Sequence, residues 1–301
     1  MRRFIPGIVI AFGTTAASVV AQDTQMPESA DRPSSDPSIE EGEARKDRIT
    51  TAVGAAVVST YISRGISFSE EPSLQAYVTV TVDVPELTGG AVTRVQVFVG
   101  NWNSIKLGPV EPTETGQLTR FYENDLYAGA RLELGQRWTV SATYYRYESL
   151  SEAFEGYNDL ELIVGFDDTG IWAGAIPLDA FSLSPSLRMV QEAGRPGRPD
   201  ALYTQPSLSP SFNLGDPERP VRVSVPLVLG ISDEYYDDVR GGHETVGFFR
   251  TGITIAGQPF ADRIPALSVD GGVDVWFLND RVANGLGNSE LTGRVGIVWS
   301  F

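Results

Sequence analysis

Several residue types that common binding and catalytic sites require are scarce in this 301-residue chain. It has no cysteine, which excludes disulfides, thiolate nucleophiles and zinc sites with cysteine ligands. Lysine occurs only at Lys46 and Lys106, and 39 acidic side chains outnumber 23 basic ones, so a nucleic-acid partner is not expected. Apart from the amino-terminal segment, no apolar run approaches the roughly 20 residues that a membrane-spanning helix needs. A bundle of transmembrane helices is therefore excluded.

Candidates for catalysis are equally few. The single histidine, His243, has no serine among the ten residues that follow it, which argues against a serine–histidine pair. Asp270 and Asp274 share a strand face but lie about 13 Å apart, too far for a glycosidase pair. An acidic cluster near His243 could offer calcium ligands but lacks the spacing of a calcium loop, and it is better read as a flexible acidic loop: Asp233, Glu234, Asp237, Asp238 and Glu244. We expect no catalytic residue, no metal and no cofactor.

The amino terminus has the layout of an export signal. Arg2 and Arg3 precede an apolar stretch that ends in short side chains at Val19-Val20-Ala21, as a signal peptidase requires, so residues 1–21 are expected to be cleaved. A buried amino-terminal helix is the alternative. Residues 22–48 are rich in Pro, Ser, Glu and Asp and predict a disordered, acidic periplasmic tether. Of the formal charge of -16, residues 49–301 carry -14, because the leader carries +2 and the tether -4.

From residue 49 onward the hydrophobic period is two, which is typical of β-strands. In residues 74–84, Leu74, Val78 and Val82 share one face while Gln75 and Thr79 share the other. About twelve such segments occur, near residues 50–61, 73–84, 91–103, 122–134, 137–148, 157–167, 180–190, 201–214, 219–231, 245–256, 266–278 and 290–301. Pro185, Pro206, Pro210 and Pro226 fall inside three of them, which leaves ten strands or a kinked wall as alternatives there.

Two architectures use such strands: a soluble β-sandwich, and a transmembrane β-barrel with lipid outside and polar residues inside. Tight connections such as 85–90 and 134–136 alternate with longer ones such as 104–121 and 232–244, as in an outer-membrane barrel. The pattern favours an all-β, up-and-down antiparallel barrel over residues 49–301.

Charged side chains on the polar stripes are the candidates to line a pore. A sandwich would expose them to water on its outer faces instead. They are Arg94, Arg131, Arg188, Arg222, Arg250, Arg294, Asp83, Asp125, Glu133, Asp159, Glu161, Asp270 and Asp274. Aromatic residues near strand ends predict girdles at the two membrane interfaces, namely Trp102, Tyr122, Tyr144, Tyr147, Tyr157, Trp276, Trp299 and Phe301.

The chain ends in LTGRVGIVWSF, with apolar residues at alternate positions up to Trp299 and Phe301. This ending resembles the last strand by which the barrel-assembly machinery recognises outer-membrane proteins. We therefore expect Trp299 and Phe301 to act as an assembly signal.

A second resemblance covers about residues 55–165. The segment YISRGISFSEEPSLQ resembles the opening motif of the TorF family of proteobacterial outer-membrane proteins, which are named as porins; the matching residues are Tyr61, Arg64, Gly65, Ser67, Pro72 and Gln75. GNWNS, ENDLYAGA and YNDLEL extend the match, whereas Ser63 stands where the family usually has an aromatic residue. The resemblance implies an outer-membrane barrel. Physically, Arg64 and Gly65 should lie where the first strand meets its loop, with Arg64 pairing an acid on a neighbouring strand.

Together these features predict a channel of the bacterial outer membrane for passive diffusion of small hydrophilic solutes. The expected surroundings are membrane lipid and lipopolysaccharide. The alternatives are a non-conducting structural or receptor barrel and, third, an outer-membrane enzyme.

Overall fold

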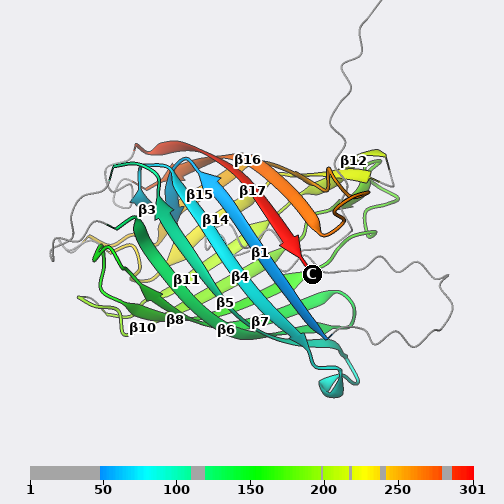
Figure 1. Ribbon diagram of the computed structural model, residues 1–301, viewed down its shortest axis with the longest axis horizontal. Coiled ribbons are helices and arrows are strands. Elements are labelled where there is room, and N and C mark those ends of the chain that lie inside the picture. The colour runs from blue at the N-terminus through cyan, green and yellow to red at the C-terminus, as the bar shows by residue number, and fades with distance from the viewer. Residues whose placement is uncertain (1–47, 110–118, 198, 217–218, 238–241, 280–286) are drawn as a thin grey trace, which may run out of the picture.

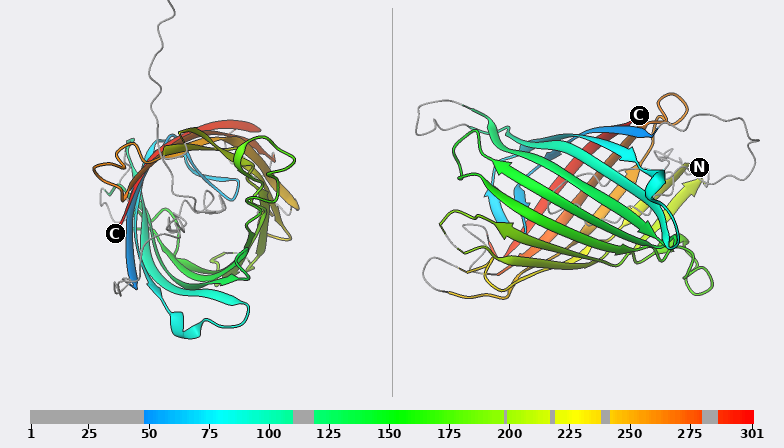
Figure 2. Two further views of the ribbon diagram at one scale, coloured as in Figure 1. Left: turned by 90° about the vertical axis from the view of Figure 1, so that its right-hand side faces the viewer. Right: turned by 90° about the horizontal axis from the view of Figure 1, so that it is seen from below.

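The computed structural model describes residues 48–109, 119–197, 199–216, 219–237, 242–279 and 287–301. They form a closed antiparallel β-barrel whose strands run obliquely around one axis (Figures 1 and 2). Residues 1–47, which include the expected signal peptide and nearly all of the expected tether, lie outside the described residues. No helix in the described part is both long and apolar enough to cross a membrane.

Twelve strands make the wall, which confirms the predicted fold class and strand count. Nine are continuous: β1 (Ile49–Val58), β4 (Ser73–Asp83), β5 (Val92–Lys106), β6 (Phe121–Leu134), β7 (Trp138–Glu148), β8 (Tyr157–Phe166), β15 (Val246–Gly257), β16 (Leu267–Leu278) and β17 (Ser289–Ser300). Three are each split into two pieces: β9 (Asp179–Ser182) with β10 (Ser186–Ala193), β11 (Leu202–Leu208) with β12 (Ser211–Asp216), and β13 (Arg219–Ser224) with β14 (Leu227–Ser232). A short 3-10 helix, η2 (Pro85–Leu87), lies in the connection from β4 to β5.

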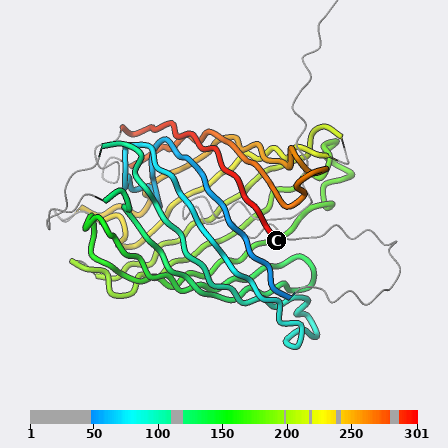
Figure 3. Tube along the Cα trace, in the orientation of Figure 1, coloured from blue at the N-terminus to red at the C-terminus, as the bar shows by residue number. Residues whose placement is uncertain are grey.

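The barrel closes by pairing its last strand with its first. In that seam Trp299 of β17 lies opposite Val53 of β1, and the backbone N–H groups of Thr51 and Phe301 each donate to the other residue's carbonyl. The chain winds up and down with neighbouring strands adjacent in sequence, as the tube in Figure 3 shows. The barrel end where β1 begins and β17 ends is called the termini end below, and the opposite end is called the far end.

Proline explains why three strands are split. Pro185, Pro210 and Pro226 lie in the three breaks, because proline has no N–H to give to the ladder. Pro206 stays inside β11, opposite Leu187. Of the two alternatives left open by the sequence, the kinked wall is the one observed.

The strands alternate between a polar inner face and an apolar outer face. In β4, Gln75 is 2% exposed and Thr81 is also buried, whereas Val78 between them is 39% exposed. Leu126, Leu160, Ile253 and Val295 are likewise exposed on other strands. Since successive side chains in a strand point to opposite faces, the period of two in the sequence fixes this inside-outside pattern.

A short hairpin, called the inner hairpin below, connects β1 to β4 and folds into the barrel at the far end. It consists of β2 (Tyr61–Ser63) and β3 (Ile66–Ser69), and Figure 2 (left) shows it as a blue loop within the ring of strands. Its turn residues Arg64 and Gly65 both have positive φ, 50° and 79°, as a tight two-residue hairpin turn requires. A Cβ on Gly65 would lie 2.6 Å from the Phe248 ring, so only glycine fits there.

This arrangement corrects two expectations for the first strand. The strand ends at Val58 rather than near residue 61, and Arg64 does not lie at the rim. Arg64 pairs with Asp159 on β8, which is five strands away from β1 in the sheet, rather than with an acid on a neighbouring strand. The physical reason is that the hairpin crosses the interior and so reaches the opposite wall.

Candidate functional site in the barrel interior

Ion pairs cover the inner wall toward the termini end. Arg94 Nε lies 2.7 Å from Asp83 Oδ1, and its Nη1 lies 3.8 Å from Glu133, so the three form a ladder across β4, β5 and β6. Arg294 of β17 lies 2.6 Å from Asp270 of β16. Their side chains are about a quarter exposed, for example 25% for Arg94 and 28% for Asp83. This part of the interior is therefore open to water.

Toward the far end the same kind of pairing is buried. Arg188 Nε donates to Glu161 Oε2 at 2.6 Å, and Tyr145 donates to Glu161 Oε1 at 3.1 Å. The Arg188 side chain is fully buried. Burying a charge is costly unless it is paired, so these matched pairs are what allows charged residues to fill this end.

Arg64 fastens the inner hairpin to the facing wall. Its Nη2 donates to Asp159 Oδ2 at 2.5 Å and to the Tyr147 hydroxyl at 3.3 Å. Its guanidinium also lies 5.6 Å from the ring centroids of both Tyr203 and Tyr235, within cation–π range. Both Arg64 and Asp159 are buried. The hairpin is thus held by a charge-assisted bond that joins residues 95 positions apart.

A further bond and a chain of rings complete the packing of the hairpin. The Tyr236 hydroxyl donates to the Arg64 carbonyl at 3.1 Å. The Tyr61 ring lies 5.3 Å from Phe68, 5.6 Å from Trp102 and 6.4 Å from Tyr122. Because rings and the hairpin fill the space between the walls, the interior at the far end is narrow.

The predicted aromatic girdles are largely wrong. Of the eight residues named, Trp102, Tyr122, Tyr147, Tyr157 and Trp276 are buried, and only Tyr144, Trp299 and Phe301 are exposed on the outer surface. The alternation of side chains along the strands predicts that four of these five buried residues face the interior. Trp102 shares the parity of Arg94, Tyr147 that of Thr143, Tyr157 that of Asp159 and Trp276 that of Asp274. Tyr122 is buried together with Glu123 because the register with β5 shifts there.

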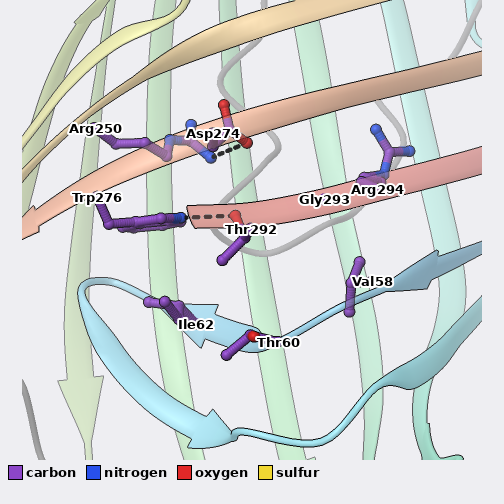
Figure 4. Close-up of a pocket in the computed structure, with 9 residues that line it drawn as sticks. All are labelled: Val58, Thr60, Ile62, Arg250, Asp274, Trp276, Thr292, Gly293 and Arg294. Atoms are coloured by element: carbon purple, nitrogen blue, oxygen red, sulfur yellow. Dashed lines mark hydrogen bonds and ion pairs between the residues drawn. The ribbon is translucent and has the colours of Figure 1, made fainter. Parts of the chain in front are cut away.

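A cavity lies between the base of the inner hairpin and the wall of β15, β16 and β17 (Figure 4). Its empty volume is about 340 Å³, part of which is open to solvent. Thr60 and Ile62 line one side, and Arg250, Asp274 and Arg294 line the other. Arg250 lies 4.0 Å from Asp274 and 5.0 Å from the centre of the Trp276 ring. Polar groups of both signs therefore border the space beside the hairpin.

The remaining predicted residues have varied surroundings. Arg131 lies between Gln96 and Ser141 in register, and Arg222 donates to the hydroxyl groups of Ser182 and Ser211 at 3.2 and 2.6 Å. Asp125 contacts Glu123, a neighbour that the sequence analysis did not single out although it shares the same parity. Of the resemblance motif, Ser67 lies in β3, Pro72 is exposed just before β4, and Gln75 is buried in β4.

The described part of the loop with His243 contains no group of side chains that could hold a metal ion. His243 Nδ1 lies 2.7 Å from Asp237 Oδ1 near the surface, and Asp238 is outside the described residues. Within the described ranges, no three His, Cys, Asp or Glu side chains are grouped so that they could hold a metal ion.

Asp168 is a structural residue that sequence reasoning missed. It follows β8, and its carboxylate accepts hydrogen bonds from Trp172 Nε1 at 2.6 Å and from the backbone N–H groups of Leu183 and Ser184 at 2.9 Å, at the break before Pro185. Its pKa is lowered, because although burial acts to raise it, these hydrogen bonds to the charged form outweigh burial. Asp168 lies in a connecting segment without a regular pattern, so the sequence gives no signal for these hydrogen bonds.

No protein-family model matches the sequence, and no curated protein matches it. Solved structures do match. The COG4313 outer membrane channel from Pseudomonas putida F1 has a TM-score of 0.51 at 11% identity, covering 88% of this chain and 100% of that chain. The β-domain of the Bordetella autotransporter BrkA gives 0.44 at 10% identity, over 84% of this chain and 98% of that one. The transport unit of the Escherichia coli autotransporter AIDA-I gives 0.39 at 13%, over 87% and 93%. The similarity to the COG4313 protein establishes that this chain has the fold of an outer-membrane β-barrel.

Proposed function

We propose that the protein is a channel of the bacterial outer membrane that lets small hydrophilic solutes diffuse passively. One observation carries the proposal: a closed barrel has an apolar exterior and an interior lined by ion-paired side chains that are partly open to water. A polar lumen of this kind suits water and polar solutes, while the outer face suits lipid and lipopolysaccharide. The TorF resemblance and the channel fold of the COG4313 protein agree with it.

The orientation follows from the chain ends. Both ends of the described barrel lie at the termini end. Since barrels with an even strand number keep both chain ends in the periplasm, we expect the inner hairpin at the extracellular side. Solutes would then meet the narrow, hairpin-filled part first and pass the cavity beside Arg250 and Asp274. We expect strong size selection, since the hairpin occupies much of this cross-section.

The buried hairpin favours a second candidate, a non-conducting structural or receptor barrel. Recording from refolded protein in a planar bilayer separates the two. We expect discrete current steps of small size, and inserted protein that passes no current would favour the second candidate.

Charge selectivity tests the inner wall directly. Replacing Arg94, Arg131 and Arg294 together with glutamine should shift the reversal potential in a salt gradient toward cations, because the variant removes three positive charges from the lumen. Heat-dependent migration in detergent gels checks that the variant still folds. An unchanged reversal potential would show that these residues do not line the conducting path.

A further inference from the structure

Two acidic side chains on β6 stand out on the inner wall beneath the inner hairpin. Glu123 and Asp125 are two residues apart, so they point to the same face, and their carboxyl groups contact each other. Both are at least 95% buried. In the described part of the chain neither forms an ion pair with a basic side chain, and Arg64, whose charge acts on both, is bonded to Asp159. Two buried carboxyl groups thus contact each other, and among the described residues no basic side chain is bonded to either.

Two neutral polar side chains without a hydrogen-bond partner among the described residues, Gln75 and Ser104, lie in the same row as Glu123. Gln75 of β4, Ser104 of β5 and Glu123 are directly opposite one another across three strands. Within the described residues, both amide atoms of Gln75 (Oε1 and Nε2), Ser104 Oγ, Glu123 Oε2 and Asp125 Oδ1 are buried and make no hydrogen bond. Each such group is costly, and native proteins keep few of them, so their gathering at one place needs an explanation.

Two contacting carboxylates in a buried position must share a proton or hold a cation between them. A shared proton would leave the oxygens of Gln75 and Ser104 without partners. A cation would use them as ligands. The ligand set consists only of oxygen, with two carboxylates, an amide carbonyl and a hydroxyl, which suits a hard cation such as calcium, magnesium or manganese better than zinc or copper.

We propose that Glu123 and Asp125 bind one calcium ion, with Gln75 and Ser104 as neutral ligands. Calcium is favoured over magnesium because it accepts irregular oxygen sets with amide carbonyls, whereas magnesium demands a regular octahedron and retains water. This proposal departs from the expectation of no metal, which counted only the acidic loop near His243. It does not depend on whether the barrel conducts.

The site also bears on the inner hairpin. The Tyr61 hydroxyl donates to Glu123, and the Tyr61 ring packs against Trp102, the neighbour of Asp125 across the strands. An ion that fixes the two carboxylates therefore also fixes the base of the hairpin. Calcium should then stabilise both the wall and the closed position of the hairpin.

Calorimetric titration of the folded full chain in detergent with calcium chloride, after treatment with a chelator, tests the proposal. We expect saturable binding of one ion per chain and a higher unfolding temperature in calcium than in chelator, with a smaller effect from magnesium chloride. The double variant E123Q/D125N should lose both effects. The matched control is D83N, which removes a carboxylate from the same wall near the termini end and should keep calcium binding.

The single variant Q75A keeps the test decisive if the double variant does not fold. It leaves both carboxylates in place and should weaken calcium binding by at least roughly tenfold, the loss that even outer-shell partners of a metal site produce. Absence of saturable binding to the wild type, or binding that survives in E123Q/D125N, would overturn the proposal. A double variant that is more stable than a calcium-insensitive wild type would show that the pair shares a proton instead.

Discussion

Replacing Arg64 with alanine should release the inner hairpin. Alanine removes the bond of 2.5 Å to Asp159, the bond to Tyr147 and the two cation–π contacts, and it leaves the Asp159 carboxylate buried without its partner. Removing one member of a buried ion pair typically costs about 3–5 kcal/mol. At about 1.36 kcal/mol per factor of ten, this shifts the ratio of docked to released hairpin by roughly 150-fold to 5,000-fold.

The strands themselves should tolerate the change. The hairpin pairs only with itself, whereas the seam of the wall between β1 and β17 does not involve Arg64. In single-channel recordings the variant should therefore open more often or to a larger conductance than the wild type. Heat-dependent migration in detergent gels should stay unchanged.

A matched control is Arg94→Ala, which breaks a quarter-exposed ion pair near the termini end and leaves the hairpin contacts untouched. It should alter ion selectivity without the large gain in conductance. If Arg64→Ala inserts into the bilayer with wild-type conductance and opening frequency, the hairpin is not held by Arg64 or does not narrow the path.

Three further changes test the wall. Deleting Phe301, which pairs with the first strand through two backbone hydrogen bonds and follows the exposed Trp299, should lower the amount of protein in outer-membrane fractions; unchanged levels would contradict an assembly role. Gly54→Ala should destabilise the barrel by about 1–3 kcal/mol, because its Cβ would lie 2.2 Å from the Tyr77 ring, and denaturant unfolding measures the loss. Asp168→Asn should lower the unfolding temperature at neutral pH. Since the pKa of Asp168 is lowered, its charged form stabilises the fold above its ordinary pKa, near 4, and this stabilisation is lost as the pH falls further. The difference between wild type and variant should therefore shrink in acid, and a difference independent of pH would refute the role of its charge.

The sequence by itself determined which side chains of the barrel wall face the interior and which face outward. Alternation in a strand is local, because the pleat sends each side chain to the face opposite its neighbour, so Gln75 and Val78 could be assigned to inside and outside from their positions alone. The count of twelve segments and the alternation of short and long connections then indicated a closed meander. Position near a strand end does not by itself put an aromatic residue at the membrane interface, because parity decides its face; Trp102 has inward parity and is buried.

Tertiary structure alone decided what fills the barrel. Closure of the barrel brings β8 opposite the hairpin, so Arg64 contacts Asp159, which lies 95 positions later in the sequence. No local sequence pattern encodes a contact between residues so far apart in the chain. It likewise sets Gln75, Ser104 and Glu123 in one row, because the register between strands depends on the turns and hydrogen bonds of the whole sheet. Local periodicity tells which way a side chain points, whereas the partner it meets there depends on how the wall curves and closes.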